Sequence, residues 1–306
     1  MSSASHTAFP GADDTRQQPA KKPAPRFLGF DVTLDWLLRP LFGFGLAGIA
    51  VVATWYGGLW FALLIAIGSS AAVREWHRML AGEGYGALMI VSVVGIVSAT
   101  ASAALIAHSP NPALEGVPWF ALAAAAMVDS VLASTRRAKT LWHASALLYI
   151  GVPALSLVMI REIAPHGAWA LFALFFAVWG SDTGALFSGS LIKGPKLWPA
   201  LSPNKTWAGF FGGTAAGAVM ATVVFAVVHA NPWVGAALGT VAALVGHAGD
   251  LFESWVKRSV GRKNSGSLIP GHGGVLDRVD SMLFVAPVAA VVLLGLHFDP
   301  FVIGAP

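Results

Sequence analysis

The chain has 306 residues, of which 56% are hydrophobic, and its mean hydropathy is +0.69. These values exclude an ordinary soluble domain, and the absence of cysteine excludes disulfides and thiolate metal sites. The formal net charge is +4. In so apolar a chain the basic residues are better explained as holding loops at a membrane surface than as a nucleic-acid site, so we expect membrane lipid and no nucleic acid as partners.

The first 39 residues differ in composition from the rest. Residues 1–26 are rich in Ser, Ala, Pro and Gln, which predicts a disordered cytoplasmic tail. Residues 27–39 mix apolar side chains with Asp31, Asp35 and Arg39, a pattern typical of a short interfacial helix. We therefore expect residues 1–39 to precede the membrane-embedded part of the chain.

From residue 40 onward, apolar runs recur with the length needed to cross about 30 Å of hydrocarbon. Because a helix satisfies its own backbone hydrogen bonds in lipid, we predict an all-α polytopic integral membrane protein with about nine transmembrane helices. The expected spans are 40–56, 59–73, 85–108, 118–134, 144–160, 168–187, 209–230, 232–249 and 281–297. They divide into N-terminal transmembrane helices, residues 40–167, and a C-terminal transmembrane catalytic region, residues 168–306.

The basic residues predict the orientation, because Lys and Arg concentrate in cytoplasmic loops. Alternate loops carry basic clusters, whereas the loops between them, such as 109–117 and 162–167, carry none. The clusters are Arg74 and Arg78; Arg136, Arg137 and Lys139; Lys193, Lys196 and Lys205; and the series from Lys257 to Arg278. This pattern predicts a cytoplasmic N-terminus, an external C-terminus and polar loops on the cytoplasmic side of the cell (inner) membrane.

One polar stretch joins the sixth and seventh expected spans. Asp182 lies toward the cytoplasmic end of an apolar helix, where an idle carboxylate is costly, so we expect it to be paired, metal-bound or in a polar cavity. Lys205 precedes the seventh span, and a cation beside a helix N-terminus suits a phosphate. Ser202 and Thr206 are candidates either for helix caps or for nucleotide contacts.

The densest polar stretch follows the eighth expected span. Asp250, Glu253 and Lys257 have the three- and four-residue spacing that places side chains on one helix face. Asp277 and Asp280 share a face at the start of the ninth span. Carboxylates gathered beside basic residues are typical of a Mg²⁺ site that is completed by phosphate oxygens. The alternative interpretation is a solvated helix face with salt bridges.

Between these acids the run 270–274 reads PGHGG. Such glycine density opposes helix and permits close approach of the backbone to a ligand. His272 lies between two glycines, close in sequence to Asp277, and is either a ligand contact or an ordinary hydrogen-bonding residue.

Several runs carry a resemblance to a known family. They are SWVKR at 254–258, Lys263, IPGHGGVLDRVD at 269–280, DTGA at 182–185, SP at 202–203, KTW at 205–207 and Gly209. Together they resemble the signature of the phosphatidate cytidylyltransferases, the CDP-diacylglycerol synthases. The similarity is specific over about residues 168–294, and earlier spans resemble the family only in hydropathy and in the pair Arg74–Glu75.

The resemblance implies transfer of CMP from CTP to phosphatidate, giving CDP-diacylglycerol and pyrophosphate. It implies Mg²⁺ as cofactor, with a monovalent cation as a candidate second ion, and it suggests a homodimer. The implied metal ligands are Asp250 and Asp277, supported by Asp182 and Asp280. The implied catalytic residues are Asp250, Asp277, Lys257 and Arg258. The implied substrate-binding residues are Ser202, Lys205, Lys263, Asn264, His272, Gly273, Gly274 and Arg278.

Two positions depart from the family pattern. Asn264 stands where the family usually has Asp, and Ala208 stands where it usually has Glu. A CTP-dependent lipid-alcohol kinase and a weakly active lipid- or nucleotide-binding paralogue are therefore alternatives. A transporter is disfavoured, because its polar groups would lie near the bilayer midplane. Glu75 beside Arg74 predicts an interfacial ion pair, and Asp129 has no assigned role.

Overall fold

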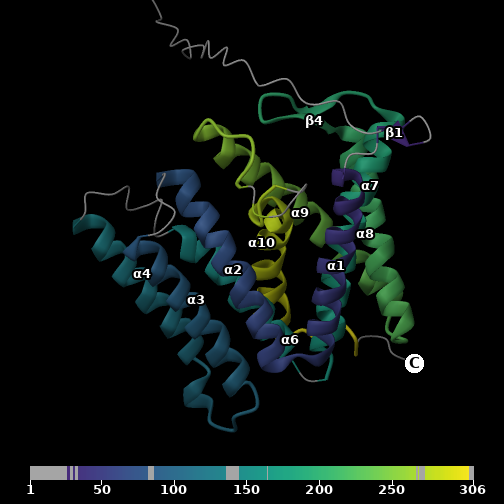
Figure 1. The fold of residues 1–306 in the computed structure, drawn as a ribbon. Helices are drawn as coiled ribbons and strands as arrows, with labels where there is room; N and C mark the ends of the chain where they lie inside the picture. The colour runs from purple at the N-terminus through teal and green to yellow at the C-terminus, as the bar shows by residue number, and fades with distance from the viewer. Residues whose placement is uncertain are drawn as a thin grey trace, which may run out of the picture.

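The computed structural model describes residues 26–27, 30–31, 34–81, 86–135, 145–163, 165–266, 268 and 273–302. Most of this structure is helical (Figure 1). Two short antiparallel hairpins are the exceptions. In these, β1 (Arg26–Phe27) pairs with β2 (Phe30–Asp31), and β3 (Lys196–Trp198) pairs with β4 (Ser202–Thr206). The tail predicted for residues 1–25 lies outside the described residues.

The helices follow one another with short connections. They are α1 (Leu34–Tyr56), α2 (Gly58–Ala81), α3 (Ala87–Ile106), the one-turn η1 (Pro112–Leu114), α4 (Val117–Thr135), η2 (Leu147–Gly151), α6 (Val152–Arg161), α7 (Gly167–Ile192), α8 (Trp207–Val227), α9 (Pro232–Ser259), α10 (Leu276–Ala290) and η3 (Val291–Gly295). Within the described residues, seven helices are long and apolar enough to cross a membrane, and two shorter apolar helices cover 43–56 and 147–161. An all-α polytopic membrane protein is thus confirmed, while the count of nine spans and the orientation of the termini stay predictions.

Several helices are longer than the hydropathy pattern indicates. The sequence predicts spans at 232–249 and 281–297, whereas α9 runs to Ser259 and α10 begins at Leu276. The expected ends coincide with the first charged residues. The helices continue because Glu253 and Val256 still face the protein interior. The acids of the densest polar stretch, Asp250, Glu253, Asp277 and Asp280, therefore lie on helices rather than in a loop.

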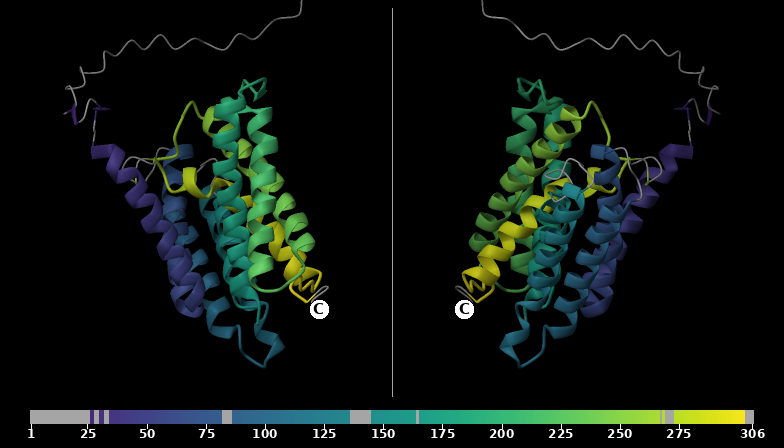
Figure 2. Two further views of the ribbon diagram at one scale, coloured as in Figure 1. Left: turned by 90° about the vertical axis from the view of Figure 1, so that its right-hand side faces the viewer. Right: turned by 90° about the vertical axis from the view of Figure 1, so that its left-hand side faces the viewer.

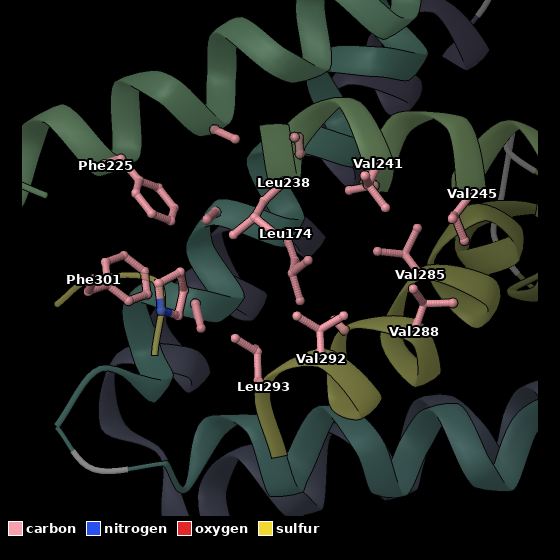
Figure 3. A pocket seen from close by; sticks show the side chains of 18 residues that line it. Leu174, Phe225, Leu238, Val241, Val245, Val285, Val288, Val292, Leu293 and Phe301 are labelled. Atoms are coloured by element: carbon pink, nitrogen blue, oxygen red, sulfur yellow. The ribbon is translucent and has the colours of Figure 1, made fainter. Parts of the chain in front are cut away.

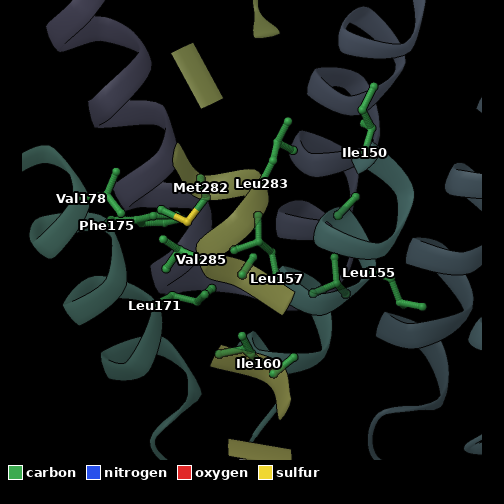
Figure 4. Packing of buried hydrophobic residues seen from close by; sticks show 14 of the residues in the cluster. Ile150, Leu155, Leu157, Ile160, Leu171, Phe175, Val178, Met282, Leu283 and Val285 are labelled. Atoms are coloured by element: carbon green, nitrogen blue, oxygen red, sulfur yellow. The ribbon is translucent and has the colours of Figure 1, made fainter. Parts of the chain in front are cut away.

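The centre of the bundle is built on α10. This helix packs against α9, α6 and α7. Its buried Met282, Leu283 and Val285 meet buried apolar side chains of α6 and α7 (Figure 4). Because lipid is as apolar as these side chains, close fit rather than hydrophobicity holds such helices together. The start of α10 is thereby held at a defined place in the bundle.

Helices α7 and α8 share the most extensive interface among the described helices, and small residues line it. A Cβ added at Gly184 would lie 2.4 Å from Ala216 Cβ, and one at Gly213 would lie 2.7 Å from Ser181 O. The backbones therefore approach as closely as in other small-residue membrane interfaces. At the start of α8, the Thr206 hydroxyl oxygen accepts the Gly209 N–H at 3.0 Å, which confirms Thr206 as the helix cap.

The two ends of the bundle are chemically different. The β3–β4 hairpin and the C-terminal end of α9 lie at one end, and the end of the described chain lies at the other (Figures 1 and 2). At that second end Arg161 donates hydrogen bonds to Thr54 O and Trp55 O, and the Gly58 N–H donates to Glu162 Oε1 at 2.9 Å. Arg161 was not part of the charge pattern used for orientation. Its bonds to the backbone explain why an arginine can lie at this end.

Candidate functional site

A cavity of about 460 Å³ lies at the end of the bundle where α7 and α9 finish and α8 and α10 begin. Besides apolar and glycine residues, polar and charged side chains of three helices (α7, α9 and α10) and of the β3–β4 hairpin line it. The latter are Asp182, Ser190, Asn204, Lys205, Thr206, His247, Asp250, Asp277, Arg278 and Asp280. The fold thus brings together all four predicted metal ligands and two of the predicted phosphate-binding cations, from segments about 100 residues apart in the sequence.

Two other cavities lack this combination. The cavity among α7, α8, α9 and α10 is lined by apolar side chains and glycine (Figure 3). The cavity at the opposite end, about 580 Å³, includes Glu115, Glu162 and Asp299, and its described lining residues include no Lys or Arg. Chemistry on phosphates needs cations as well as metal-binding acids, so the cavity around Asp250 is the candidate site.

Lys205 and Asp250 meet across the mouth of the candidate site. Lys205 Nζ forms an ion pair with Asp250 Oδ2, and their side chains are 25% and 31% exposed. Lys205 comes from the hairpin and Asp250 from α9, so this pair connects the two polar stretches seen in the sequence. Both side chains line the cavity, although the Lys205 Nζ atom itself is buried against Asp250.

Behind the lining, Lys257 is enclosed by two carboxylates. Its Nζ donates to Glu253 Oε2 at 2.8 Å and to Asp277 Oδ1 at 2.7 Å. The Glu253 side chain is fully buried, and those of Lys257 and Asp277 are 12% and 11% exposed. Lys257 does not line the cavity. The structure therefore places this predicted catalytic residue where it neutralises and orients Asp277.

Asp277 has donors on both carboxylate oxygens. Oδ2 accepts the N–H of Ser265 at 3.1 Å and that of Gly274 at 3.0 Å, while Oδ1 faces Lys257. By accepting the Ser265 and Gly274 N–H groups, Asp277 stabilises the conformation of the turn before α10. Its predicted role as a main metal ligand stays a prediction, and a metal would have to share it with these donors.

The remaining acids are more available to a cation. Within the described part of the chain, no three carboxylate or histidine side chains are placed to hold a metal ion by themselves. Mg²⁺ usually takes one or two carboxylates and completes its shell with water and substrate phosphates. Asp182, Asp250 and Asp280 face one cavity, and their mutual repulsion would be relieved by a cation. The residues therefore fit a divalent ion shared with a phosphate ligand.

Several predicted residues lie away from the cavity. Arg258 is exposed and its Nη1 donates to Arg262 O at 3.2 Å. Lys263 and Asn264 are exposed, and Ser202 belongs to β4, opposite Trp198. His272 lies outside the described residues. For the part of the chain that is described, the site is thus narrower than the family signature implies.

Gly274 has a different role from the one predicted. Its N–H is donated to Asp277, so it is not free for a phosphate in this arrangement. A Cβ at this position would lie 2.1 Å from Ser265 Oγ and 2.4 Å from Glu75 Oε2. The glycine is required for close packing of protein groups. Gly273 has a φ of +84°, a conformation that glycine adopts without strain.

The two departures from the family pattern also lie outside the lining. Asn264 is exposed on the loop after α9, and Ala208 is half-buried in the first turn of α8. Neither of them is among the residues that form the cavity. In this chain the side chains at these two positions therefore lie outside the candidate site.

Sequence reasoning missed three polar residues near the site. His247 lies one turn before Asp250 on α9, lines the cavity, and has its Nε2 3.5 Å from Ser181 Oγ. Its spacing from Asp250 was a usable signal. Asn204 also lines the cavity.

Glu75 was predicted as an interfacial ion pair, but it is only 5% exposed and accepts hydrogen bonds from the start of α10. Its spacing from the buried Ala72 and Met79 indicated an inward face.

Comparison with known proteins identifies the family. The model of the cytidylyltransferase family matches residues 37–296. The phosphatidate cytidylyltransferase of Brucella abortus biovar 1 (strain 9-941) is 37% identical over 271 residues, covering 85% of this chain and 93% of that protein. The phosphatidate cytidylyltransferase of Staphylococcus epidermidis (strain ATCC 35984) is 34% identical over 241 residues, covering 76% and 88%. The one from Staphylococcus aureus (strain COL) is 30% identical over 243 residues, covering 78% and 91%. With a match over most of its length, the chain belongs to the cytidylyltransferase family.

Proposed function

We propose that this protein transfers CMP from CTP to phosphatidate and releases pyrophosphate, forming CDP-diacylglycerol at the membrane surface. The observation that carries the proposal is the cavity in which four aspartates face Lys205 and Arg278, in a helical membrane bundle of the cytidylyltransferase family. Relatives that match over most of this chain are named for that activity.

The reaction makes particular demands on the site. A phosphate oxygen of phosphatidate attacks the α-phosphorus of CTP, and the bond from that phosphorus to the oxygen bridging to the β-phosphate breaks, so pyrophosphate leaves. The attacking oxygen is already an anion at neutral pH, so no strong general base is required. The site must instead bring two anions together and stabilise the charge that develops on the leaving group.

The residues divide these tasks. Lys205 and Arg278 provide positive charge for phosphate groups, and Asn204 and the capped start of α8 lie beside them on the hairpin side. Asp250, with Asp182 and Asp280, would hold Mg²⁺, which supplies charge neutralisation at the phosphates. Lys257 holds Asp277, which in turn orders the turn before α10. The candidate second, monovalent cation would have to use the same acids.

Location and orientation belong to the same proposal. The site lies at the end of the bundle that carries Lys193, Lys196, Lys205, Lys257, Arg258, Arg262, Lys263 and Arg278. Positive charge of this density favours the cytoplasmic face of the cell (inner) membrane. In this proposal the seven long apolar helices and the two shorter ones of the described residues are the nine spans. The suggested homodimer is to be tested by the mass of the purified protein in detergent.

A direct assay separates this proposal from lipid-alcohol phosphorylation. Purified protein in mild detergent receives Mg²⁺, a lipid acceptor and CTP labelled in either the α- or the γ-phosphate. We expect label in lipid only with α-labelled CTP and phosphatidate, with release of pyrophosphate, and none with Asp250→Ala. Label in lipid only from γ-labelled CTP with a lipid alcohol would replace the proposal by the kinase reaction.

A further inference from the structure

Glu75 of α2 is a carboxylate from the N-terminal half of the chain that is bound to the start of α10. Its Oε1 accepts the N–H of Val275 at 3.0 Å, and its Oε2 accepts the N–H of Leu276 at 3.0 Å and the hydroxyl of Ser265 at 3.2 Å. The side chain reaches across 190 to 201 residues of sequence to make these bonds. Glu75 is 5% exposed, so water does not compete for them.

The surrounding backbone is shaped to accept this carboxylate. A Cβ added at Gly266 would lie 2.6 Å from Glu75 Oε1, and one at Gly274 would lie 2.4 Å from Glu75 Oε2. Any other residue at either position would collide with the carboxylate or displace it. Two glycines of the charged stretch thus serve the contact with α2.

The contact continues to the candidate site through Ser265. The Ser265 hydroxyl donates to Glu75, and its backbone N–H donates to Asp277 at 3.1 Å. Asp277 lines the cavity and accepts Lys257 on its other oxygen. The first free N–H groups of a helix need acceptors and favour a negative charge, and Glu75 supplies both to α10. Fixing this helix start also fixes where Asp277 and Asp280 point.

We propose that Glu75 is a positioning residue for the transfer reaction: it holds the turn before α10 so that Asp277 faces the cavity in its working orientation. This inference rests on the proposed function for its catalytic consequence. It makes the N-terminal transmembrane helices a support of the active centre, because among the described residues the acceptor for the Val275 and Leu276 N–H groups comes from α2.

The kinetic test uses Glu75→Gln, Glu75→Ala and Glu75→Asp in the full-length protein. Misplacing a reacting group by about 1 Å can cost about 100-fold in rate, so we expect kcat to fall about 100-fold in Glu75→Ala. We expect a fall of about tenfold in Glu75→Gln, which keeps the shape but loses one acceptor, in line with losses seen when supporting groups are altered. Glu75→Asp keeps the charge and should recover part of kcat. KM for CTP should change less than kcat, because Lys205 and Asn204 are untouched.

Glu162→Gln is the matched control. Glu162 is also a nearly buried glutamate that accepts a backbone N–H from a distant segment, but it lies at the other end of the bundle. We expect its kcat to equal that of the wild type. If activity falls in both Glu75→Gln and Glu162→Gln, in proportion to the amount of folded protein lost, Glu75 acts only through stability and the proposal is overturned.

Ser265→Ala gives a milder variant in case the Glu75 variants do not fold. It removes one of the three hydrogen bonds while leaving the backbone donor to Asp277 in place. We expect a smaller fall in kcat in Ser265→Ala than in Glu75→Gln. We expect the double variant to have the same kcat as Glu75→Gln alone, because both substitutions weaken the same contact between Glu75 and Ser265. Wild-type kcat in Ser265→Ala together with additive losses in the double variant would count against the link.

Hydrogen exchange of backbone amides tests the contact between Glu75 and the start of α10 without substrate. We expect the amides of Val275 and Leu276 to exchange about tenfold faster or more in Glu75→Ala, since a lost hydrogen bond costs about 1–3 kcal/mol. Unchanged exchange, or faster exchange with unchanged kcat, would overturn the inference. Absence of CDP-diacylglycerol from the wild-type protein would instead overturn the proposed function, so the two failures are distinguishable.

Discussion

Asp277 and Asp299 lie at opposite ends of the bundle and make similar local contacts. Each carboxylate accepts a nearby backbone N–H and pairs with a basic side chain. Asp277 accepts from the Gly274 N–H and from Lys257, and Asp299 accepts from the Phe301 N–H and pairs with His166 at 2.9 Å. They differ in their surroundings. Around Asp277 a cavity combines acids with Lys205 and Arg278, whereas the cavity around Asp299 has acids and histidines and no described Lys or Arg in its lining. We infer that the combination of cations with acids is what distinguishes the candidate site from the cavity around Asp299.

The strongest test of this comparison is Asp277→Ala against Asp299→Ala. We expect Asp277→Ala to lower turnover about 1,000-fold, comparable to the loss of a major electrostatic group at a reacting phosphate. We expect Asp299→Ala to retain wild-type turnover. CDP-diacylglycerol formation is measured in detergent, and gel filtration checks that both variants are folded. Equal activity of the two variants would remove the distinction between the ends.

The second test compares the side chains that pair with the carboxylates at the two ends. Lys257→Met leaves Glu253 buried without its counter-charge, and breaking a buried pair typically costs about 3–5 kcal/mol of stability. His166→Gln breaks a pair whose side chains are 30% and 37% exposed, so we expect a loss of less than about 1 kcal/mol. Thermal unfolding in the same detergent measures both. A Lys257→Met protein as stable as the wild type would show that Glu253 finds another partner.

Lys205→Met sharpens the comparison by removing a cation from the lining alone. We expect KM for CTP to rise about tenfold, because a hydrogen bond to a charged group is worth about 1.5–3 kcal/mol. Stability should change little, since Lys205 and its partner Asp250 are partly exposed. The matched variant Lys196→Met, on β3 of the same hairpin, should leave KM unchanged, as Lys196 does not line the cavity. A similar rise in both would indicate general attraction of the nucleotide by the basic hairpin.

Asn264→Asp should have the smallest effect. Asn264 is exposed and outside the cavity lining, and an exposed charge contributes at most about 1 kcal/mol. We therefore expect kcat/KM to stay within about fivefold of the wild type. A gain or a loss of more than about tenfold in the same assay would show that this loop reaches the substrate during turnover.

The sequence by itself determined the class of the protein and most of the cavity. Hydropathy reports whether a segment belongs in lipid, so an all-α membrane protein followed directly. The same constraint makes intramembrane carboxylates conspicuous, and Asp182, Asp250, Asp277 and Asp280 do line one cavity. Lys205 was found from its place before a helix N-terminus, and Arg278 from the family resemblance.

The tertiary structure alone decided which charged groups face the ligand and which hold the others in place. Lys257 turns to Glu253 and Asp277, Arg258 turns to its own loop, and Gly274 makes room for Glu75. These pairings depend on how α2, α9 and α10 pack. Local patterns report the environment of one segment, whereas a hydrogen bond across 201 residues depends on the arrangement of every helix between its ends.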